Sequence, residues 1–326
     1  MNLKQSLSNF MELTRAYALP VTFSSCLIIW AFAHYSTNFT YLNFALLVVA
    51  LCCVHLGANL FDDYMDVKNK YKQCGCLENI SFDRVVLKAN LILNRTFSKR
   101  QVVSIFSILF LIGLSIGIYF AKIVSTNILI IAAAGGLLAL FYPNSAKYYL
   151  SEVIIGLIYG PLMINGGYYA LTGTFSYGCF ICSVAVFFTA IILLHTDNIM
   201  DWEHDVKENK KTLAIMYKDK TRAIALLKSL IFWAYAVIVI AVAFQVLNPK
   251  SLYVFLTLPI AVKLPDSMDD YIKIKDVKFI PRWYYGPFEN WKKIQEARID
   301  FFMFRMYLAR NFVLLFSLFL AVGTIR

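Results

Sequence analysis

Charged residues are scarce in this sequence. Asp, Glu, Lys and Arg make up 16% of its 326 residues, whereas they make up about 25% of an ordinary soluble domain. Glycine is too infrequent for a collagen, with 14 residues in the whole chain. Hydrophobic residues account for 60%. The composition therefore excludes a disordered chain, a collagen and a soluble nucleic-acid-binding protein.

The cysteine pattern excludes a disulfide framework. The number of cysteines is odd, at seven, and five lie in apolar runs: Cys26, Cys52, Cys53, Cys179 and Cys182. Cys74 and Cys76 form a single CGC in a polar loop, without the second pair of ligands that a zinc site needs. We expect free thiols that face a reducing cytosol.

Long hydrophobic runs dominate the chain. A run of about 18 or more apolar residues predicts a membrane span. We predict nine spans, at residues 13–36, 40–66, 101–121, 125–142, 150–172, 177–200, 222–247, 250–265 and 302–324. The eighth is short and contains Pro259. The sequence therefore predicts an all-α polytopic membrane protein, one domain over residues 1–326, with nine transmembrane helices around one central cavity.

Basic residues predict the orientation of these spans. Of the 31 Lys and Arg residues, 28 fall in the N-terminal segment and the loops after even-numbered spans, and the others are Lys122, Lys250 and Arg326. The positive-inside rule then places the N-terminus and these loops in the cytosol, and this orientation accounts for the net charge of +11 without a nucleic-acid partner. We expect an integral protein of the cell's inner membrane, with the segment RWYYGPFENW at 282–291 at the membrane surface.

The second predicted span ends in the acidic segment HLGANLFDDYMDVKNKYK, residues 55–72. Residues three or four apart share a face of a helix. Asn59 therefore lies beside Asp63, and Asp66 lies beside both Asp62 and Asp63. This cluster would sit at the cytosolic end of the span.

A second acidic segment, LLHTDNIMDWEHDVKENKKTLA at 193–214, ends the sixth span. Asp197, Asp201 and Asp205 are spaced i, i+4, i+8, which predicts one stripe on a helix. Because the two segments close equivalent helices, they suggest a pseudo-repeat of two halves, about 1–145 and 146–326. A solvated, charged helix end is the alternative interpretation of either cluster by itself.

Two aspartate clusters on one side of a membrane need a compensating cation. Oxygen ligands without flanking His or Cys favour Mg²⁺ over zinc. Since Mg²⁺ completes its octahedron with water and phosphate oxygens, the clusters would suit a bridged diphosphate. Arg15, Lys210 and Lys211 are close enough in sequence to neutralise its oxygens.

These motifs resemble those of the UbiA superfamily of intramembrane prenyltransferases, which carry NDxxD after the second span and DxxxD after the sixth. Here they read DDYMD at 62–66 and DWEHD at 201–205. FYPNSAKYYLSEVIIGLIYGPLMINGGYYALTG at 141–173 and DNIMDWEHDVKENKKTLA at 197–214 are similar to the menaquinone branch, the 1,4-dihydroxy-2-naphthoate polyprenyltransferases. The likeness covers most of the chain.

The chain departs from the family pattern at several positions, including Lys70 and Lys72, where the first motif of the branch normally continues with Gly and Asp. Asp62 stands where the family usually has Asn. Asp197 and Met200 replace the Asn and Arg of the branch, and Asn209 replaces its Gly. These differences leave room for an acceptor other than the usual one of the branch.

The resemblance implies Mg²⁺-dependent transfer of a polyprenyl group from an allylic diphosphate to an aromatic acceptor, most simply 1,4-dihydroxy-2-naphthoate, in a lipid bilayer. It implies catalytic roles for Asp63, Asp66, Asp201 and Asp205. The expected metal ligands are Asp62, Asp63, Asp66, Asp197, Asp201 and Asp205. The residues expected to bind diphosphate or acceptor are Asn59, Arg15, Tyr142, Lys147, Asn198 and Lys210.

Other interpretations stay open at this point. Another branch of the superfamily would use 4-hydroxybenzoate, haem, chlorophyllide or a glycerol phosphate lipid. DDYMD also fits a soluble prenyl diphosphate synthase, although nine spans argue against it. A transporter would place its acids near the bilayer midplane. His55 and His195 suit acid–base chemistry or packing, and Glu152 matches a Glu of the branch or complements a helix dipole.

Overall fold

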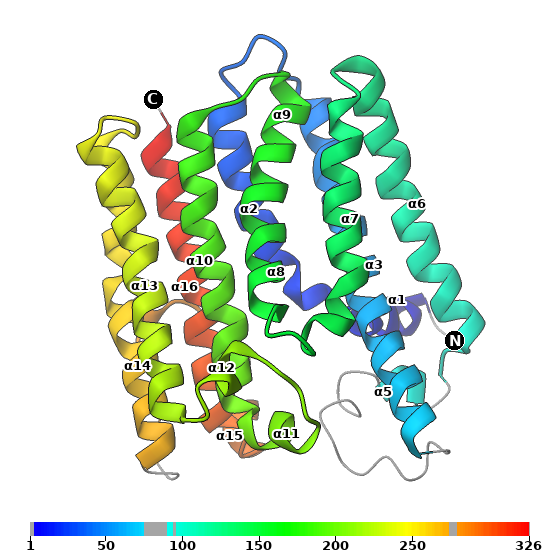
Figure 1. Cartoon of the computed structure of the whole chain (residues 1–326), viewed down its shortest axis with the longest axis vertical. Helices are drawn as coiled ribbons and strands as arrows, with labels where there is room; N and C mark the ends of the chain where they lie inside the picture. The colour runs from blue at the N-terminus through cyan, green and yellow to red at the C-terminus, as the bar shows by residue number, and fades with distance from the viewer. Residues whose placement is uncertain (1–2, 75–89, 94–95, 274–278, 326) are drawn as a thin grey trace. The chain divides into compact units, whose positions relative to one another are not determined.

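The computed structural model describes residues 3–74, 90–93, 96–273 and 279–325 (Figure 1). All regular elements in these residues are helical. The chain forms two units, and each is considered by itself. Unit 1 comprises Met1–Phe23 and Thr40–Pro143, and unit 2 comprises Ser24–Phe39 and Asn144–Arg326.

Unit 1 is built on two long helices that pack along each other. Its elements are α1 (Leu3–Leu13), η1 (Ala16–Ala18), the start of α2 (Leu19–Ala33), α3 (Tyr41–Cys74), α5 (Asn90–Leu93), α6 (Lys99–Ile123) and α7 (Asn127–Ser145). A cluster of buried side chains joins α1, α3, α5 and α6: Leu13, Leu60, Val67, Ile92 and Val102. This cluster lies around the end of α3 that carries the first acidic motif.

Unit 2 surrounds one central helix. It contains most of α2, α8 (Ser151–Leu157), η3 (Ile158–Asn165), α9 (Gly166–Thr172), α10 (Tyr177–Met200), α11 (Trp202–Lys207), α12 (Leu213–Met216), α13 (Lys220–Ala243), η4 (Pro249–Thr257), α14 (Leu258–Lys273), η5 (Trp283–Tyr285), α15 (Trp291–Glu296) and α16 (Asp300–Thr324). Helix α10 packs against α8, η3, α13 and α16. The second acidic motif follows this central helix directly.

Eight helical segments of the described residues are long and apolar enough to span a membrane: Ala16–Ala33, Tyr41–Asn69, Lys99–Ile123, Asn127–Ser145, Ser151–Thr172, Tyr177–Met200, Lys220–Ala243 and Asp300–Thr324. Each matches a predicted span to within a few residues, so the all-α membrane class is confirmed. The count of nine is not reproduced. The segment predicted at 250–265 is divided between the 3₁₀-helix η4 and the short helix α14, and Lys263, Asp266, Asp269 and Asp270 make α14 polar.

The fifth span changes its helical geometry in the middle. Residues Ile158–Asn165 form a π-helix that contains Pro161. The side-chain amide of Asn165 donates to the Pro161 carbonyl at 2.9 Å and to Ser183 Oγ of α10 at 2.8 Å. A Cβ at Gly160 would lie 2.5 Å from the Ser183 carbonyl oxygen, so only glycine permits this close packing of η3 on α10.

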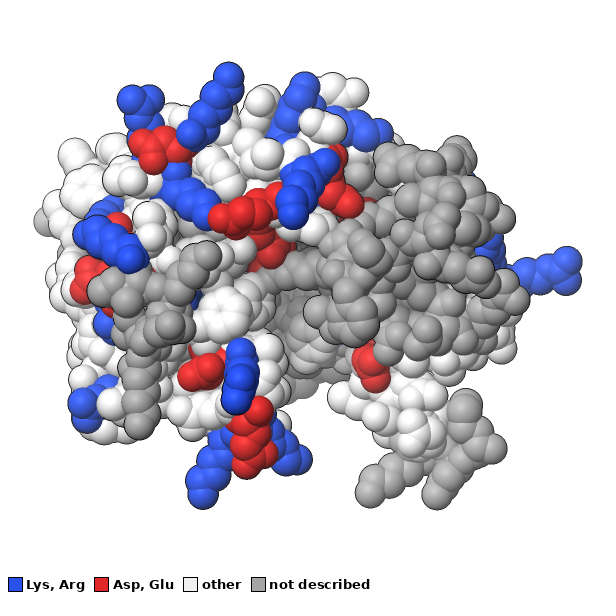
Figure 2. Space-filling view, turned by 90° about the horizontal axis from the view of Figure 1, so that it is seen from below, with Lys and Arg blue, Asp and Glu red and all other residues white. Residues whose placement is uncertain are grey.

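The aromatic segment before α16 folds back onto that helix. Asn311 of α16 donates to the carbonyl oxygens of Tyr285 and Pro287, both at 2.9 Å. Trp283 points outward and is 89% exposed. Figure 2 views the end of the molecule at which α11, α12 and α15 are drawn, and charged side chains gather over it. The position of the segment at a membrane surface and the orientation of the chain stay predictions.

Candidate active site

The first acidic motif lies on α3 and faces a basic residue of the same unit. Arg15 Nη2 lies 3.0 Å from Asp62 Oδ2, and Arg15 Nε lies 3.3 Å from Asp63 Oδ2. Asp63 is buried, at 2% exposure. Arg15 Nη2 also donates to the Asn59 carbonyl at 3.1 Å. The extra carboxylate at position 62 is therefore balanced by a cation that bridges both acids.

Arg15 reaches these acids because the chain turns sharply between α1 and η1. Its φ is +52°, in the left-handed region, which L-residues with long side chains rarely adopt. The side-chain amide of Asn59 holds the turn by donating to the Thr14 carbonyl at 3.3 Å. No feature of the neighbouring residues predicts this turn, so the contact of Arg15 with the two aspartates is seen only in the folded chain.

The electrostatics of Arg15 are dominated by its acidic partners. Burial by itself would lower the pKa of the guanidinium, but the carboxylates of Asp63 and Asp62 raise it more, and the net shift is upward. Tyr142 of α7 contributes in the same direction. Arg15 therefore stays charged. The third aspartate of the motif, Asp66, is half-buried and lies one turn further along α3.

The second acidic motif lies at a helix break. Helix α10 ends at Met200 and α11 begins at Trp202, with Asp201 between them. The backbone still runs on in register, because Asp201 N donates to the Asp197 carbonyl and Asp205 N donates to the Asp201 carbonyl, each at 2.9 Å. The predicted stripe of three aspartates therefore spans two helices instead of one.

Asp205 is the buried carboxylate of the second motif, at 3% exposure. Lys210 Nζ lies 3.4 Å from its Oδ1. Burial raises the pKa of this carboxyl, and Lys210 and His204 oppose the shift without cancelling it. The second motif thus repeats the arrangement of the first, with a buried aspartate next to a basic side chain.

Two loops that carry predicted phosphate-binding lysines are paired by backbone hydrogen bonds. Lys211 N donates to the Ala146 carbonyl at 2.5 Å, and Tyr149 N donates to the Lys211 carbonyl at 3.0 Å. Lys147 lies in one loop, exposed, with its Nζ 2.9 Å from Asn144 Oδ1. Lys210 precedes Lys211 in the other. The pairing brings the two lysines onto neighbouring segments of unit 2.

The residue before Lys210 adopts a left-handed conformation. Asn209 has a φ of +52°, which Gly and Asn tolerate better than other residues. This explains how Asn can stand where the menaquinone branch has Gly. We expect Asn209→Gly to leave thermal stability in detergent unchanged within a few tenths of a kcal/mol, and Asn209→Ala to cost about 1 kcal/mol. Equal stability of the two variants would contradict this account.

A buried polar network, which the sequence did not predict as a unit, lies beside the second motif. Glu152 of α8 is fully buried. Its Oε1 accepts from Asn198 Nδ2 at 2.6 Å and from Leu213 N at 3.0 Å, and its Oε2 accepts from Ser151 Oγ at 2.7 Å. In the sequence, this network is indicated only by a carboxylate that lies inside an apolar span. Such a carboxylate needs hydrogen-bond partners.

The donor sets of both motifs fit Mg²⁺ held together with a phosphate ligand. They consist of hard carboxylate oxygens, and Mg²⁺ needs only one or two of these besides water and phosphate. Within the described part of the chain, no group of three His, Cys, Asp or Glu side chains is arranged to hold a metal ion. A cage made of protein ligands alone, such as a structural zinc site, is therefore not formed there. The CGC pair, Cys74 and Cys76, lies outside the side chains that the structure describes.

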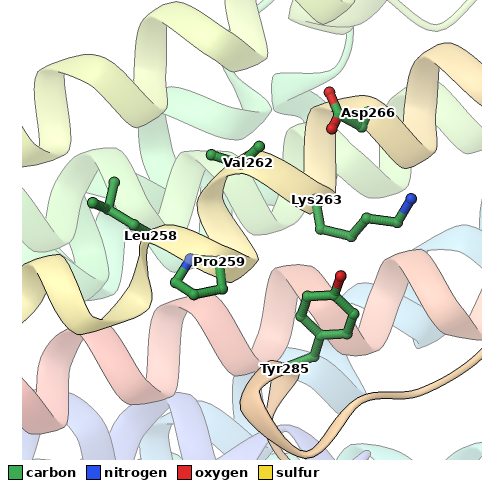
Figure 3. A pocket seen from close by; sticks show the side chains of 6 residues that line it. All are labelled: Leu258, Pro259, Val262, Lys263, Asp266 and Tyr285. Atoms are coloured by element: carbon green, nitrogen blue, oxygen red, sulfur yellow. The ribbon is translucent and has the colours of Figure 1, made fainter.

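A separate hollow of about 400 Å³ lies along α14 of unit 2 (Figure 3). Its lining residues are Leu258, Pro259, Val262, Lys263, Asp266 and Tyr285. None of the residues that the sequence assigned to the site is among them. The candidate chemistry therefore rests on the two acidic motifs and not on this hollow.

The chain is similar to known prenyltransferases. The model of the UbiA prenyltransferase family matches residues 19–264. A 1,4-dihydroxy-2-naphthoate octaprenyltransferase of Bacillus subtilis (strain 168) is 21% identical over 261 residues, which are 78% of this chain and 81% of that protein.

Two solved structures share the fold. The apo structure of a UbiA homolog from Aeropyrum pernix K1 has a TM-score of 0.63 at 14% identity, over 92% of this chain and 96% of that one. A structure from work on a digeranylgeranylglyceryl phosphate synthase has a TM-score of 0.58 at 17% identity, over 98% of this chain and 99% of that one.

The family match covers well over half of the sequence and includes both acidic motifs. This family match does not support the two alternatives raised by the sequence, a soluble prenyl diphosphate synthase and a transporter. Together with eight helices that can cross a membrane, it identifies the chain as an integral membrane prenyltransferase that belongs to the UbiA prenyltransferase family.

Proposed function

We propose that this chain transfers a polyprenyl group from an allylic polyprenyl diphosphate to 1,4-dihydroxy-2-naphthoate, with Mg²⁺ as the cofactor. The observation that carries the proposal is the repeated pairing of a buried aspartate with a basic side chain. Asp63 pairs with Arg15, and Asp205 lies next to Lys210. Carboxylates suit the metal, and basic groups beside them suit phosphate oxygens.

In this proposal the five aspartates of the two motifs, together with Asp197, hold the metal ions. Bound Mg²⁺ would withdraw charge from the leaving diphosphate, as a Lewis acid does. Arg15, Lys147 and Lys210 neutralise phosphate oxygens, and Asn59 and Tyr142 line the substrate. The bond from the allylic carbon to oxygen breaks with its electron pair on the diphosphate. A new bond forms to the ring carbon that bears the acceptor's carboxylate. The bond from that carbon to the carboxylate breaks, and its electron pair restores the aromatic ring as CO₂ leaves.

The choice of acceptor rests on the naphthoate-type sequence motifs and on the name of the Bacillus subtilis relative. Both are consistent with the TLA sequence at 212–214. Asp62, Asp197 and Met200 depart from that branch. We propose further that the site faces the cytosol of the inner membrane, because the basic loops lie on the same side as both motifs in the predicted topology.

A transfer assay on the purified chain tests the proposal directly. Labelled polyprenyl diphosphate is supplied in lipid with 1,4-dihydroxy-2-naphthoate, 4-hydroxybenzoate or a glycerol phosphate lipid, each with Mg²⁺ and with EDTA. We expect product with the naphthoate, and a loss of at least a hundredfold with EDTA, because the metal supplies several kcal/mol to such a step.

The possible outcomes separate the parts of the proposal. Product with another acceptor alone would overturn the naphthoate assignment and keep the mechanism. Full activity in EDTA would overturn the metal requirement. No transfer to any acceptor, from protein shown to be folded, would overturn the proposed reaction.

A further inference from the structure

We propose that Glu152 is the positioning residue of the second acidic motif, and that it sets how tightly this motif binds a divalent cation with a diphosphate. The inference rests on the proposed function, since it concerns the same motif. It assigns to Glu152 a role beyond complementing a helix dipole. Glu152 itself does not contact the metal or the substrate in this account.

The carboxylate of Glu152 is buried, and both of its oxygens accept hydrogen bonds. The residue is fully buried at the start of α8, in a segment long and apolar enough to span a membrane. A carboxylate at such a place is costly unless it is fully satisfied. Here both oxygens accept hydrogen bonds, from Ser151, Asn198 and the Leu213 amide. Because these partners belong to α8, α10 and α12, the carboxylate ties three elements together.

The two bonds to Oε1 hold the two ends of one loop. Asn198 lies three residues before Asp201, and the Leu213 amide lies three residues after Lys210. Both donate to the same oxygen, at 2.6 and 3.0 Å. The segment 199–212, which contains Asp201, Asp205 and Lys210, is therefore closed by a single acceptor atom. Loss of that atom would remove both of these bonds at once.

A buried histidine lies beside the carboxylate and bonds to α13. His195 is fully buried on α10, and its Nδ1 lies 3.7 Å from Glu152 Oε1. Its Nε2 lies 3.0 Å from the Ala223 carbonyl of α13. Because a carbonyl oxygen only accepts, Nε2 must be the donor of that bond. The hydrogen bonds of Glu152 thus join α8, α10 and α12, and the adjacent His195 joins α10 to α13.

The segment 199–212 is also hydrogen-bonded to the loop that carries Lys147. Lys211, inside the closed segment, exchanges backbone hydrogen bonds with Ala146 and Tyr149. Glu152 follows that loop after two residues. The carboxylate therefore fixes the acidic motif and both lysine-bearing loops as one piece of unit 2. Groups that orient metal ligands in this way typically account for 10- to 100-fold in metal affinity.

The test measures metal binding without turnover. Wild-type chain and Glu152→Gln are compared for binding of Mn²⁺ in the presence of inorganic pyrophosphate, by electron paramagnetic resonance. Glutamine has the same shape but no charge, so the bonds from Asn198 and the Leu213 amide lose their charge assistance. Its amide nitrogen also cannot accept the bond from Ser151 Oγ. We expect Mn²⁺ affinity to fall at least tenfold, and amide hydrogen exchange across 201–214 to speed up by a similar factor.

Tyr235→Phe is the matched control. It also removes a buried hydrogen bond of unit 2, from the Tyr235 hydroxyl to Thr257 Oγ1 at 2.6 Å, but it leaves the second motif untouched. We expect its Mn²⁺ affinity and its exchange across 201–214 to match the wild type within twofold. If it weakened Mn²⁺ binding as much as Glu152→Gln does, a general loss of stability would explain the effect and the proposal would fall.

Glu152→Asp serves if the glutamine variant does not fold. It keeps the charge, but it is one methylene too short to reach both Asn198 and Leu213, and we expect the same changes. Unaltered Mn²⁺ affinity in a folded Glu152 variant would overturn the positioning role, as would faster exchange without weaker binding. No Mn²⁺ binding by the wild type with pyrophosphate would also overturn it. Failure of prenyl transfer alone would remove the proposed reaction and leave these measurements intact.

Discussion

Replacing Asp201 with alanine should lower the rate of prenyl transfer about a thousandfold or more, while the protein stays folded. The expected loss follows from removing a metal ligand, because the metal contributes several kcal/mol and each 1.4 kcal/mol is about tenfold in rate. The fold should persist, since Asp201 joins α10 and α11 through backbone bonds that alanine also makes. The measurement is turnover at saturating Mg²⁺, with thermal unfolding alongside.

Glu203→Gln provides the control from inside the same motif. Glu203 is two residues away, but its side chain is 61% exposed and pairs with Lys220. Since exposed ion pairs contribute about 0–1 kcal/mol, we expect less than a threefold change in turnover. Comparable losses in both variants would mean that the net charge of the loop matters and that Asp201 has no specific role.

Arg15→Ala should destabilise the protein by about 3 kcal/mol, the second large effect. The substitution leaves the carboxylates of Asp62 and Asp63 side by side, with Asp63 buried and without the guanidinium that now bridges them. Removal of one partner from a buried pair typically costs this much, because a desolvated charge remains. Thermal unfolding in detergent, without added divalent cations, measures the effect.

A second substitution tests the cause. Asp62→Asn alone keeps the pair between Arg15 and Asp63, so we expect a small change. Combined with Arg15→Ala, it removes one of the two repelling charges and should restore part of the lost stability. Arg222→Ala is the control, because that side chain is 72% exposed and lies 3.9 Å from Asp219. Additive losses in the double variant would contradict a charge balance at this motif.

The membrane spans could be read from the sequence because hydropathy is a local property. Eight of the nine predicted segments correspond to helices in the structure. The exception is the segment at 250–265, where Pro259 stands at the junction of η4 and α14. A proline in the sequence does not show whether a helix continues in another geometry, and most of the charges of α14 lie in its second half, beyond the predicted segment. The eighth span was therefore the one that hydropathy described least well.

The candidate site was predictable in its residue types and not in its pairings. The spacing of the aspartates placed Asp62, Asp63 and Asp66 on one helix, as α3 shows. Which cation balances them depends on a left-handed turn at Arg15, and a turn of that kind has no signature in the neighbouring residues. The bond from Glu152 to Asn198 joins positions 46 residues apart. Such contacts arise from packing between helices, which periodicity along one helix does not encode.

The π-helical turns of Ile158–Asn165 use more residues than an α-helix would need to rise by the same height. Deletion of a single residue there would allow the segment to relax into an ordinary α-helix. The change from wide to ordinary turns would take up the missing residue, so the half that carries Glu152 and the half that ends at Thr172 would keep about the same orientation to each other. The fifth span should therefore tolerate the in-frame loss of one codon within Ile158–Asn165. Loss of one codon from the regular α-helix α10, before Asn198, would instead turn Asn198 by about 100° away from Glu152, although every participating side chain is still encoded.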